Sequence, residues 1–398
     1  MSIFCKNCLY TANHPFGITF NNDGICSGCK IHKEKNIIDW DDRLTDLKKL
    51  VYPYKSKSKK TYDCIVPITG GGDSFYILHV VKNILGLNPL LVCYNRHHNS
   101  NIGIKNIARL RIAFDADLIL QNVNPLSVKK IIRTTLREFG SVYWHSIAGH
   151  TAFPVQIAEK KQIPLIIWGA HQGIEQVGMY SHLHNVEMTR RYRKEHDLMG
   201  YEADDLVSQF DSLVEQDIWQ FRYPEDNEIA KIGIRGIYLG NYIRWDPFIQ
   251  HQYVVEQYGY RGIPSNRTFY PFDHPDCMVY MGVHDLLKMA KTGYSKVTDH
   301  LVREIRHERI SRASAVIIAS MFENNPIQNT EIFCKWMNLT EAGLKYIVRS
   351  HTKNFVNLTK MHDIKDLNFI REDLAIYNKG IDFNNICDQY ITIAKGYP

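Results

Sequence analysis

The pattern of apolar and polar positions changes near residue 62 and separates two kinds of sequence. From there on, short apolar runs alternate with longer stretches whose apolar residues recur at helical spacing. Continuous apolar runs flanked by amphipathic helices indicate strands of a parallel sheet that is covered on both faces. Four strands are predicted at 62–68, 89–95, 117–122 and 163–170, and four helices at 75–86, 103–116, 126–140 and 145–161. The predicted fold class is α/β with a parallel sheet.

The flanking segments follow other patterns. Residues 39–51 have helical spacing and an acidic first turn after Asp39, which predicts a connecting helix. The stretch 52–60 is rich in Lys, Pro and Ser, typical of a solvated linker, with a basic lip over a phosphate site as the alternative. Asp246 and Pro247 predict a helix that Asp246 caps. We expect a zinc ribbon at 1–38, the helix and linker at 39–60, the α/β domain at 61–240 and a mainly helical region at 241–398.

The end of the chain is predicted to be helical. Three or four amphipathic helices are expected from about residue 314 onward, for example at 339–350 and 383–394. These segments contain no candidate chemistry. They suit a lid, a surface for a partner, or scaffold.

Composition and charge narrow the class of protein only a little. A chain of 398 residues with 44% apolar and 12% aromatic residues can bury a large core. Its formal charge of +6 fits polyanionic small substrates as well as nucleic acid. No apolar run approaches the roughly 20 residues that cross a bilayer, and the first residues have neither the basic flank nor the apolar core of a cleavable signal. We therefore expect a soluble, cytoplasmic protein.

Four of the nine cysteines form two closely spaced pairs. Cys5 and Cys8, then Cys26 and Cys29, make two C-x2-C turns, and the segment between them reads as strand, turn and strand. This spacing turns both thiolates of each pair toward one tetrahedral ion and predicts a structural zinc ribbon. Redox-active C-x2-C turns and an iron-sulfur cluster are the alternatives. Because four thiolates close the coordination sphere, no open position for chemistry is expected.

A glycine-rich turn follows the first predicted strand. Residues 65–76 read IVPITGGGDSFY, so three glycines and Asp73 and Ser74 stand between a buried strand and a helix. Such a turn lets successive N–H groups face one concavity at a helix N-terminus, which favours phosphate. Neither G-x4-G-K-[ST] nor G-x-G-x-x-G is present. A turn or helix cap alone would need one or two glycines, so phosphate binding is predicted.

This turn resembles the S-G-G-x-D-S loop of the PP-loop ATP pyrophosphatases, with Thr69 in place of the first serine. The resemblance implies an enzyme that cleaves ATP between the α and β phosphates, with Asp73 holding Mg²⁺. It also implies that Tyr94, at the end of the second strand, lies near adenine. Residues 168–175 resemble the family's second nucleotide-side loop, although an ordinary strand-to-helix turn is the alternative. The implied catalytic residues are Asp73, Ser74 and Glu175, and the implied ATP-binding residues are Thr69, Gly70, Gly71, Gly72, Asp73, Ser74, Tyr94 and Gly169.

Nearly the whole chain resembles the N-acetyl sugar amidotransferases of bacterial surface-polysaccharide and flagellar-glycan synthesis. The similar segments are the cysteine-rich start, the glycine-rich turn, 144–158, 189–200, 238–247 and 291–315. The resemblance implies that an acetamido group of a nucleotide-activated sugar is O-adenylated, releasing pyrophosphate, and that ammonia then displaces AMP to give an acetamidino group. The cofactors implied are ATP, Mg²⁺ and Zn²⁺.

Candidate substrate-binding residues lie in two of these segments. A helix beginning near Thr298 or Asp299 presents a polar, mostly basic face, which suits an anion clamp or simply a solvated surface. Trp144 and His145 could stack on and hydrogen-bond a sugar, or could belong to the core. The substrate-binding residues expected are Trp144, His145, Lys296, Asp299, His300 and Arg306.

The nitrogen donor is expected to be another protein. No cysteine stands in a G-x-C-x-G elbow, and residue 2 is serine, so neither type of glutaminase site is present. The resemblance implies a separate glutaminase subunit and a cyclase-like barrel subunit beside it, with no membrane or nucleic-acid partner. The alternative function is a tRNA-thiolating or other tRNA-modifying PP-loop enzyme. A zinc-ribbon nucleic-acid binder without enzyme activity is a further alternative, disfavoured because no stripe of aromatic and basic residues is evident.

Overall fold

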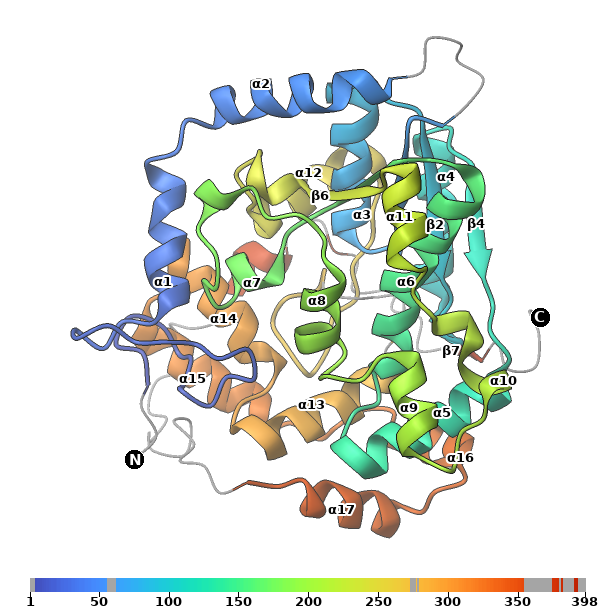
Figure 1. The fold of residues 1–398 in the computed structure, drawn as a ribbon. Coiled ribbons are helices and arrows are strands. Elements are labelled where there is room, and N and C mark those ends of the chain that lie inside the picture. The colour runs from blue at the N-terminus through green and yellow to red at the C-terminus, as the bar shows by residue number, and fades with distance from the viewer. Residues whose placement is uncertain are drawn as a thin grey trace.

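A five-stranded parallel sheet forms the centre of the protein. The computed structural model describes residues 4–55, 62–272, 277, 279–353, 374–378, 381 and 390–392. The sheet order is β4-β2-β1-β5-β6, and Figure 1 labels its strands β2, β4 and β6. Its strands are β1 Cys64–Pro67, β2 Pro89–Tyr94, β4 Leu118–Gln121, β5 Leu165–Trp168 and β6 Arg235–Tyr238. The four predicted strands are confirmed, and β6 is an additional one.

Helices make up most of the remaining described chain. They are α1 Ser27–His32, α2 Trp40–Val51, α3 Gly72–Leu78, α4 Asn101–Ala113, α5 Pro125–Phe139, α6 Trp144–Lys161, α7 Gln172–Glu175, α8 Arg190–Tyr192, α9 Ala203–Gln209, α10 Glu215–Ile218, α11 Asp226–Ile232, α12 Pro247–Tyr258, α13 Val279–Thr292, α14 Lys296–Arg306, α15 Arg312–Glu323, α16 Thr330–Met337 and α17 Glu341–Ser350. Two π-helical turns, η3 His79–Ile84 and η5 Arg193–Asp197, continue α3 and α8. Within the described ranges, no helix is long and apolar enough to cross a membrane.

The strands alternate between two apolar layers, as expected for a sheet that is buried on both faces. On β1, Val66 faces the cluster that contains α3 and the N-terminal cysteines, whereas Ile65 faces the cluster formed with α6. On β5, Ile166 packs on the same side as Ile65. Helix α6 contacts β1, β2 and β5 and covers that face.

The order of the strands places a crevice between β1 and β5. From β1 the chain moves outward through β2 and β4, and it then returns to the other side of β1 through β5 and β6. In open α/β sheets, ligands bind outside the carboxyl ends of the strands where the order reverses in this way. The glycine-rich turn follows β1, and α7 follows β5, so both open onto this crevice.

Helix boundaries agree with the sequence where capping residues mark them. Asp39 caps α2 by accepting N–H bonds from Asp41 and Asp42. Pro247 begins α12 as predicted, but Asp246 makes no capping hydrogen bond. Its carboxylate instead binds Arg309 at 2.8 and 2.9 Å, so the expected cap is corrected to an ion pair.

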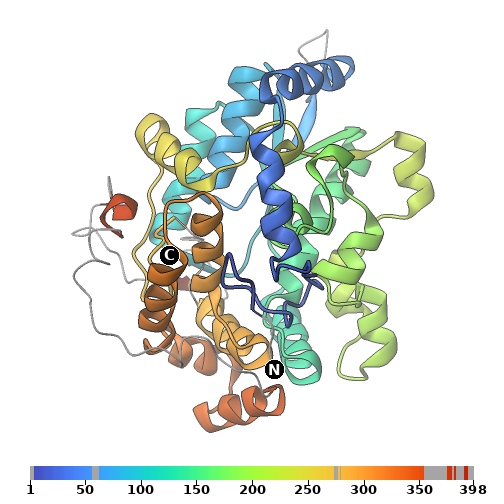
Figure 2. The same ribbon diagram turned by 90° about the vertical axis from the view of Figure 1, so that its left-hand side faces the viewer.

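The C-terminal helical region packs beside the N-terminal segment that carries the four cysteines and α1. Figure 2 shows orange helices of this region next to the blue helix α1. Three helices, α15 to α17, follow α14 as predicted. The helix expected at 383–394 lies mostly outside the described residues, and 390–392 is instead a strand, β7 Tyr390–Thr392. This strand pairs with β3 His98–Ser100 in an antiparallel ladder. Most of the predicted linker, 56–60, also lies outside the described residues.

Candidate active site and candidate metal centre

A cavity of about 400 Å³ lies at the carboxyl ends of β1 and β5. It is lined on one side by the glycine-rich turn, through Thr69, Asp73 and Ser74, and on another by Gly169 and Glu175. Helix α14 lines it through Lys296, Asp299, His300, Arg303 and Arg306. The cavity thus brings together most of the residues singled out from three distant segments of the sequence.

The glycine-rich turn has a conformation that side chains would obstruct. Gly70 has a φ of +78°, and a Cβ there would lie 2.6 Å from Ile107. At Gly72 a Cβ would lie 2.5 Å from the ring of His251. The hydroxyls brace the turn from inside, because Ser74 accepts the Thr69 N–H at 3.1 Å and Thr69 accepts the Gly71 N–H at 3.2 Å. The retained hydroxyl of Thr69 therefore has a structural use as a brace inside the turn.

Asp73 reaches into the cavity from the first turn of α3. Its side chain is 55% exposed, and its Oδ1 lies 2.8 Å from Nε2 of the buried His251. The other ring nitrogen of His251 lies 2.8 Å from the hydroxyl of Tyr270, and the Arg303 guanidinium lies 4.2 Å above the Tyr270 ring. This arrangement fixes one carboxylate oxygen and fits a carboxylate that also holds a divalent cation. His251 could not be found from the sequence, because a histidine inside a helix has no pattern that marks it.

Glu175 forms a buried ion pair with Lys35, which lies between α1 and α2. Its Oε2 lies 2.7 Å from Nζ of Lys35, whose side chain is fully buried, and its Oε1 lies 3.7 Å from Nε2 of His182. Burial alone would raise the pKa of Glu175, but Lys35 and His182 outweigh it and hold the pKa well below its usual range. Lys35 also donates to the Trp245 carbonyl at 2.8 Å. Glu175 is therefore ionised at neutral pH and already paired with a cation, which the sequence did not indicate.

The basic helix is packed against the cavity rather than solvated. Helix α14 begins at Lys296 with Ser295 at the N-cap position, so Thr298 and Asp299 lie in its first turn and do not precede it. Asp299 pairs with Lys288 and accepts a hydrogen bond from Tyr10 at 3.0 Å. Burial opposes the ionised form of Asp299, but Lys288 and Lys296 lower its pKa well below the usual range. His300 contacts the Thr268 hydroxyl through Nδ1 at 2.7 Å.

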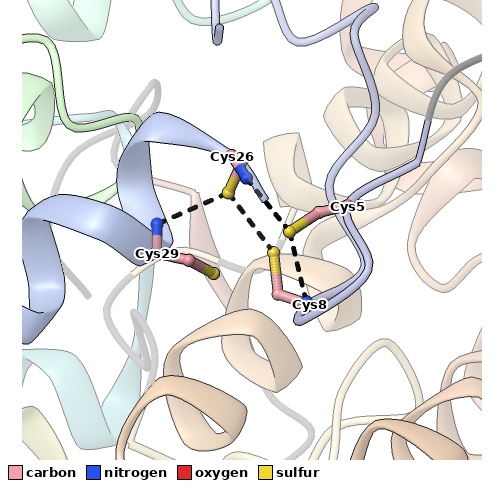
Figure 3. A group of neighbouring side chains, drawn as sticks. All are labelled: Cys5, Cys8, Cys26 and Cys29. Atoms are coloured by element: carbon pink, nitrogen blue, oxygen red, sulfur yellow. Dashed lines mark hydrogen bonds between the residues drawn. The ribbon is translucent and has the colours of Figure 1, made fainter. Parts of the chain in front are cut away.

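The four paired cysteines form a closed cluster (Figure 3). One ligand atom from each lies within 4.8 Å of all the others, and no other such group is found among the described residues. Amide N–H groups of Cys8 and Cys26 point at Cys5 Sγ at 3.4 and 3.3 Å, and that of Cys29 points at Cys26 Sγ at 3.4 Å. The expected strands around the cluster are reduced to single bridges, such as Phe20 with Cys26. Four buried thiolates with N–H···S bonds fit a tetrahedral zinc ion.

Arg306 joins the cysteine cluster to the cavity. It donates to the carbonyls of Glu175 and Gln176 at 2.8 and 2.9 Å, and its guanidinium lies 3.5 Å from Cys29 Sγ and 3.7 Å from Cys26 Sγ. Most of its donors are therefore engaged. Arg306 therefore braces the cysteine cluster against the backbone of Glu175 and Gln176. It also lines the cavity in which it was expected to bind substrate.

Three predicted residues lie away from this cavity. Trp144 is fully buried and donates to the Tyr201 carbonyl at 2.8 Å, so it is a core residue. His145 is fully buried, and its Nδ1 lies 3.0 Å from the Tyr94 hydroxyl. Burial lowers the pKa of His145 well below its usual range, so its ring is neutral. Tyr94 lines a smaller cavity that also borders Thr69 and His150, and these two residues line the main cavity as well. The structure therefore favours the core alternative for Trp144 and His145.

Comparisons with known proteins give one family match and more distant likenesses. Residues 245–371 match the family described as LPS biosynthesis protein WbpG-like, C-terminal domain. An uncharacterized protein of Methanocaldococcus jannaschii is 25% identical over 118 residues, which are 30% of this chain and 42% of that relative. The matched part therefore spans less than half the length of the relative.

Two solved structures show a low likeness to part of the chain. The NH3-dependent NAD synthetase from Campylobacter jejuni, solved with a nitrate ion, is 12% identical with a TM-score of 0.29, over 49% of this chain and 92% of that one. The NMN synthetase from Francisella tularensis is 10% identical with a TM-score of 0.26, over 57% of this chain and 99% of that one. The strand order of this protein, and not these two likenesses, establishes its parallel α/β fold.

Proposed function

We propose that this protein is an ATP-dependent, AMP-forming amidotransferase that converts an acetamido group of a nucleotide-activated sugar to an acetamidino group. The observation that carries the proposal is the meeting of the glycine-rich turn and helix α14 in one cavity. Helix α14 lies within the segment that matches the WbpG-like C-terminal domain of lipopolysaccharide biosynthesis. The cavity thus joins a phosphate-type turn to residues of a surface-polysaccharide family.

The chain's own groups suit activation of an amide oxygen by adenylation. An amide is a poor electrophile, so its oxygen must first be made a leaving group, and positioning with charge neutralisation accounts for most of such a step. The glycine-rich turn would hold the pyrophosphate, and Lys296 and Arg303 would neutralise charge on the phosphate oxygens. Asp73 is the carboxylate placed to hold Mg²⁺, which would supply charge neutralisation at the phosphates. No side chain has to form a covalent bond.

Ammonia must then displace AMP, and we propose that a separate glutaminase subunit supplies it, with a cyclase-like barrel subunit beside it. Every cysteine in the described ranges is buried. Cys64 and Cys93 are buried in β1 and β2, and burial first, with Asp63 second, raises the pKa of Cys64. The described cysteines outside the zinc-type cluster therefore do not favour the tRNA-thiolating alternative.

The test is incubation of the purified protein with ATP, Mg²⁺, ammonium chloride and a panel of nucleotide-linked acetamido sugars. We expect AMP and pyrophosphate in step with a sugar product about one mass unit lighter, since an imino group replaces oxygen after the adenylate is displaced. Glutamine should replace ammonium only when a glutaminase is added. Release of ADP would contradict the proposal, and turnover of tRNA with a sulfur donor would establish the alternative.

A further inference from the structure

A second cavity of about 150 Å³ adjoins the first one on the β6 side of the sheet. Trp168, Ala170 and Gln172, at the end of β5, line both cavities. The remaining wall comes from α6, β6 and the α8–η5 segment, which Figure 1 shows between α7 and α6. This volume is below the range of about 300 Å³ and more that pockets for drug-sized ligands occupy. The second cavity therefore suits a small ligand that enters the reaction.

One buried polar atom of this cavity has no hydrogen-bond partner in the structure, and a partly buried carboxylate lies beside it. The hydroxyl of Tyr192 is buried and unpartnered, and the residue as a whole is 8% exposed. Asp197 is partly buried and lines the same cavity from the π-helical turn η5, and the charge of Arg193 acts on its carboxyl. Buried polar groups are normally satisfied, so the Tyr192 hydroxyl indicates space for a ligand beside the Asp197 carboxylate. Single π-helical turns also occur often at functional sites.

The charges around the cavity sum to a negative value when Asp197 is ionised. Arg193 is the cation whose charge acts on Asp197, but its guanidinium is also bound to Glu202 and to the Thr151 hydroxyl at 2.7 Å. The trio of Arg193, Glu202 and Asp197 therefore carries a net charge of −1. Burial raises the pKa of Asp197 to about 7, and Arg193 only partly offsets this. A monocation beside Asp197 would remove that imbalance.

The walls of the cavity suit a small cation. The ring of His171 lies 4.3 Å from that of Tyr192 and 4.7 Å from that of Tyr238, measured between centroids. Aromatic faces attract ammonium-type cations. Burial, with a smaller effect of His196, lowers the pKa of His171 to about 4, so this ring is neutral and does not repel a cation. Arg193, Tyr192 and Tyr238 interact electrostatically with Asp197, His171 lines the same cavity, and Glu202 binds Arg193 behind it.

We propose that this cavity binds ammonium and delivers ammonia to the neighbouring reaction cavity. The proposal rests on the amidotransferase function proposed above. The Asp197 carboxylate accepts one proton from ammonium, which frees the nitrogen lone pair. Ammonia then forms a C–N bond to the activated carbon while the C–O bond to AMP breaks, and the amidine product retains the proton that the incoming nitrogen loses. Asp197 returns its own proton to solvent.

The reaction itself gives the first test. With saturating ATP and sugar, Asp197→Asn should raise the KM for ammonium about tenfold, the effect of losing a contact worth about 1.4 kcal/mol, while the KM for ATP stays unchanged. Tyr192→Phe should raise the same KM by a smaller factor. Asp211→Asn, an exposed aspartate outside the cavity lining, is the matched control and should change neither constant. Equal effects on both constants in Asp197→Asn would overturn the assignment.

A binding test separates this inference from the proposed function. Without ATP or sugar, ammonium chloride should raise the Tm of the wild-type protein more than sodium chloride at the same ionic strength, and Asp197→Asn should abolish the difference. This result would support the ammonium site even if no sugar were turned over. If ammonium and sodium act alike, the site does not exist. If potassium acts as well as ammonium, the site binds monovalent cations in general and is not a site for the nitrogen donor.

Discussion

The cysteine cluster and the cavity beside it differ in how far their polar groups are buried. Three of the four cysteines have no exposed surface, the fourth is 2% exposed, and amide groups point at their sulfurs. In the cavity, by contrast, the Asp73 side chain is half exposed, and the side chains of Lys296 and Arg303, which also line it, are 22% and 23% exposed. The first region is built like a structural centre and the second like a binding site.

The two regions are nevertheless connected through buried charges. Lys35, a few residues after α1, holds Glu175, and Arg306 spans from the cysteine sulfurs to the carbonyls of Glu175 and Gln176. A structural metal centre can therefore influence the cavity without providing a ligand to the substrate. Removal of the metal and substitution of cavity residues should therefore separate the structural effect of the cluster from the chemistry of the cavity.

The largest expected effect is on stability when the metal is removed. Chelation, or Cys26→Ser, should lower the free energy of unfolding by several kcal/mol, since structural zinc contributes roughly 10 kcal/mol or more to small zinc domains. ATP turnover should fall together with stability, because Lys35 and Arg306 lose their support. Thermal unfolding and metal analysis, with about one zinc per chain expected, check this prediction. Cys334→Ser, a buried thiol outside the cluster, is the control, and absence of zinc or an iron-sulfur absorption band would contradict the prediction.

The next largest effect is expected from the buried ion pair of Lys35 and Glu175, which lies between the two regions. Lys35→Met should destabilise the protein by about 3 to 5 kcal/mol, because it leaves the Glu175 carboxylate buried without its cation. The double variant with Glu175→Gln should recover most of this loss. Because the pKa of Glu175 is depressed, its stabilising contribution is present above about pH 4.3 and is lost as the pH falls below that value.

Chemical denaturation of the single and double variants measures this coupling. The exposed pair between Lys49 and Asp46 provides a matched control, since their side chains are 73% and 60% exposed. Lys49→Met should cost less than about 1 kcal/mol. An equally small effect of Lys35→Met would show that the two regions are independent.

Within the cavity, Asp73→Ala should lower the rate of AMP release about 100-fold or more, with little change in stability. The side chain is half exposed, so its removal leaves no buried cavity, whereas its proposed role is to hold Mg²⁺. Gly71→Val should act similarly by filling the space over the turn. AMP release is measured beside near-ultraviolet circular dichroism, and wild-type activity in either variant would show that the turn has no catalytic role.

Much of the fold could be predicted because its signals are local. The apolar runs of β1, β2, β4 and β5 and the caps of α2 and α12 depend on neighbouring residues, and they agree with the structure apart from the role of Asp246. Strand β6 was missed because the short run Arg235–Tyr238 contains glycine and a charged residue. The strand at 390–392 was missed because its pairing partner, β3, is almost 300 residues away in the sequence.

For the candidate site, too, residues with a local sequence signal could be predicted and residues that depend on long-range contacts could not. The glycine-rich turn and the cysteine pairs are local motifs and were found from the sequence. His251, Lys35 and Tyr192 were not, because their importance depends on contacts across the fold with Asp73, Glu175 and a cavity. Trp144 looked suited to stacking on a sugar, but only the packing of α6 reveals that it is buried.

The smallest expected effect concerns Asp197 in the second cavity, and it sharpens the contrast between the fully buried cysteine cluster and a cavity built to bind a ligand. Folding raises the pKa of this carboxyl from 3.8 to about 7, because burial favours the neutral form. The resulting stabilisation is fully present below about pH 4 and is lost as the pH rises through 7. Asp197→Asn lacks this dependence, so it should equal the wild type near pH 4 and be more stable by roughly 1 to 4 kcal/mol above pH 8.

Urea unfolding of both proteins between pH 4 and pH 9 measures the difference, with Asp211→Asn as the control that should follow the wild type. A carboxyl that Arg193 fully compensated would give parallel curves and would refute the charge imbalance on which the ammonium site depends. Added ammonium chloride should narrow the gap above pH 8, where Asp197 is ionised, and leave the proteins unchanged near pH 4. A gain in stability on removing a charge would mark Asp197 as a residue that weakens the fold while serving a ligand.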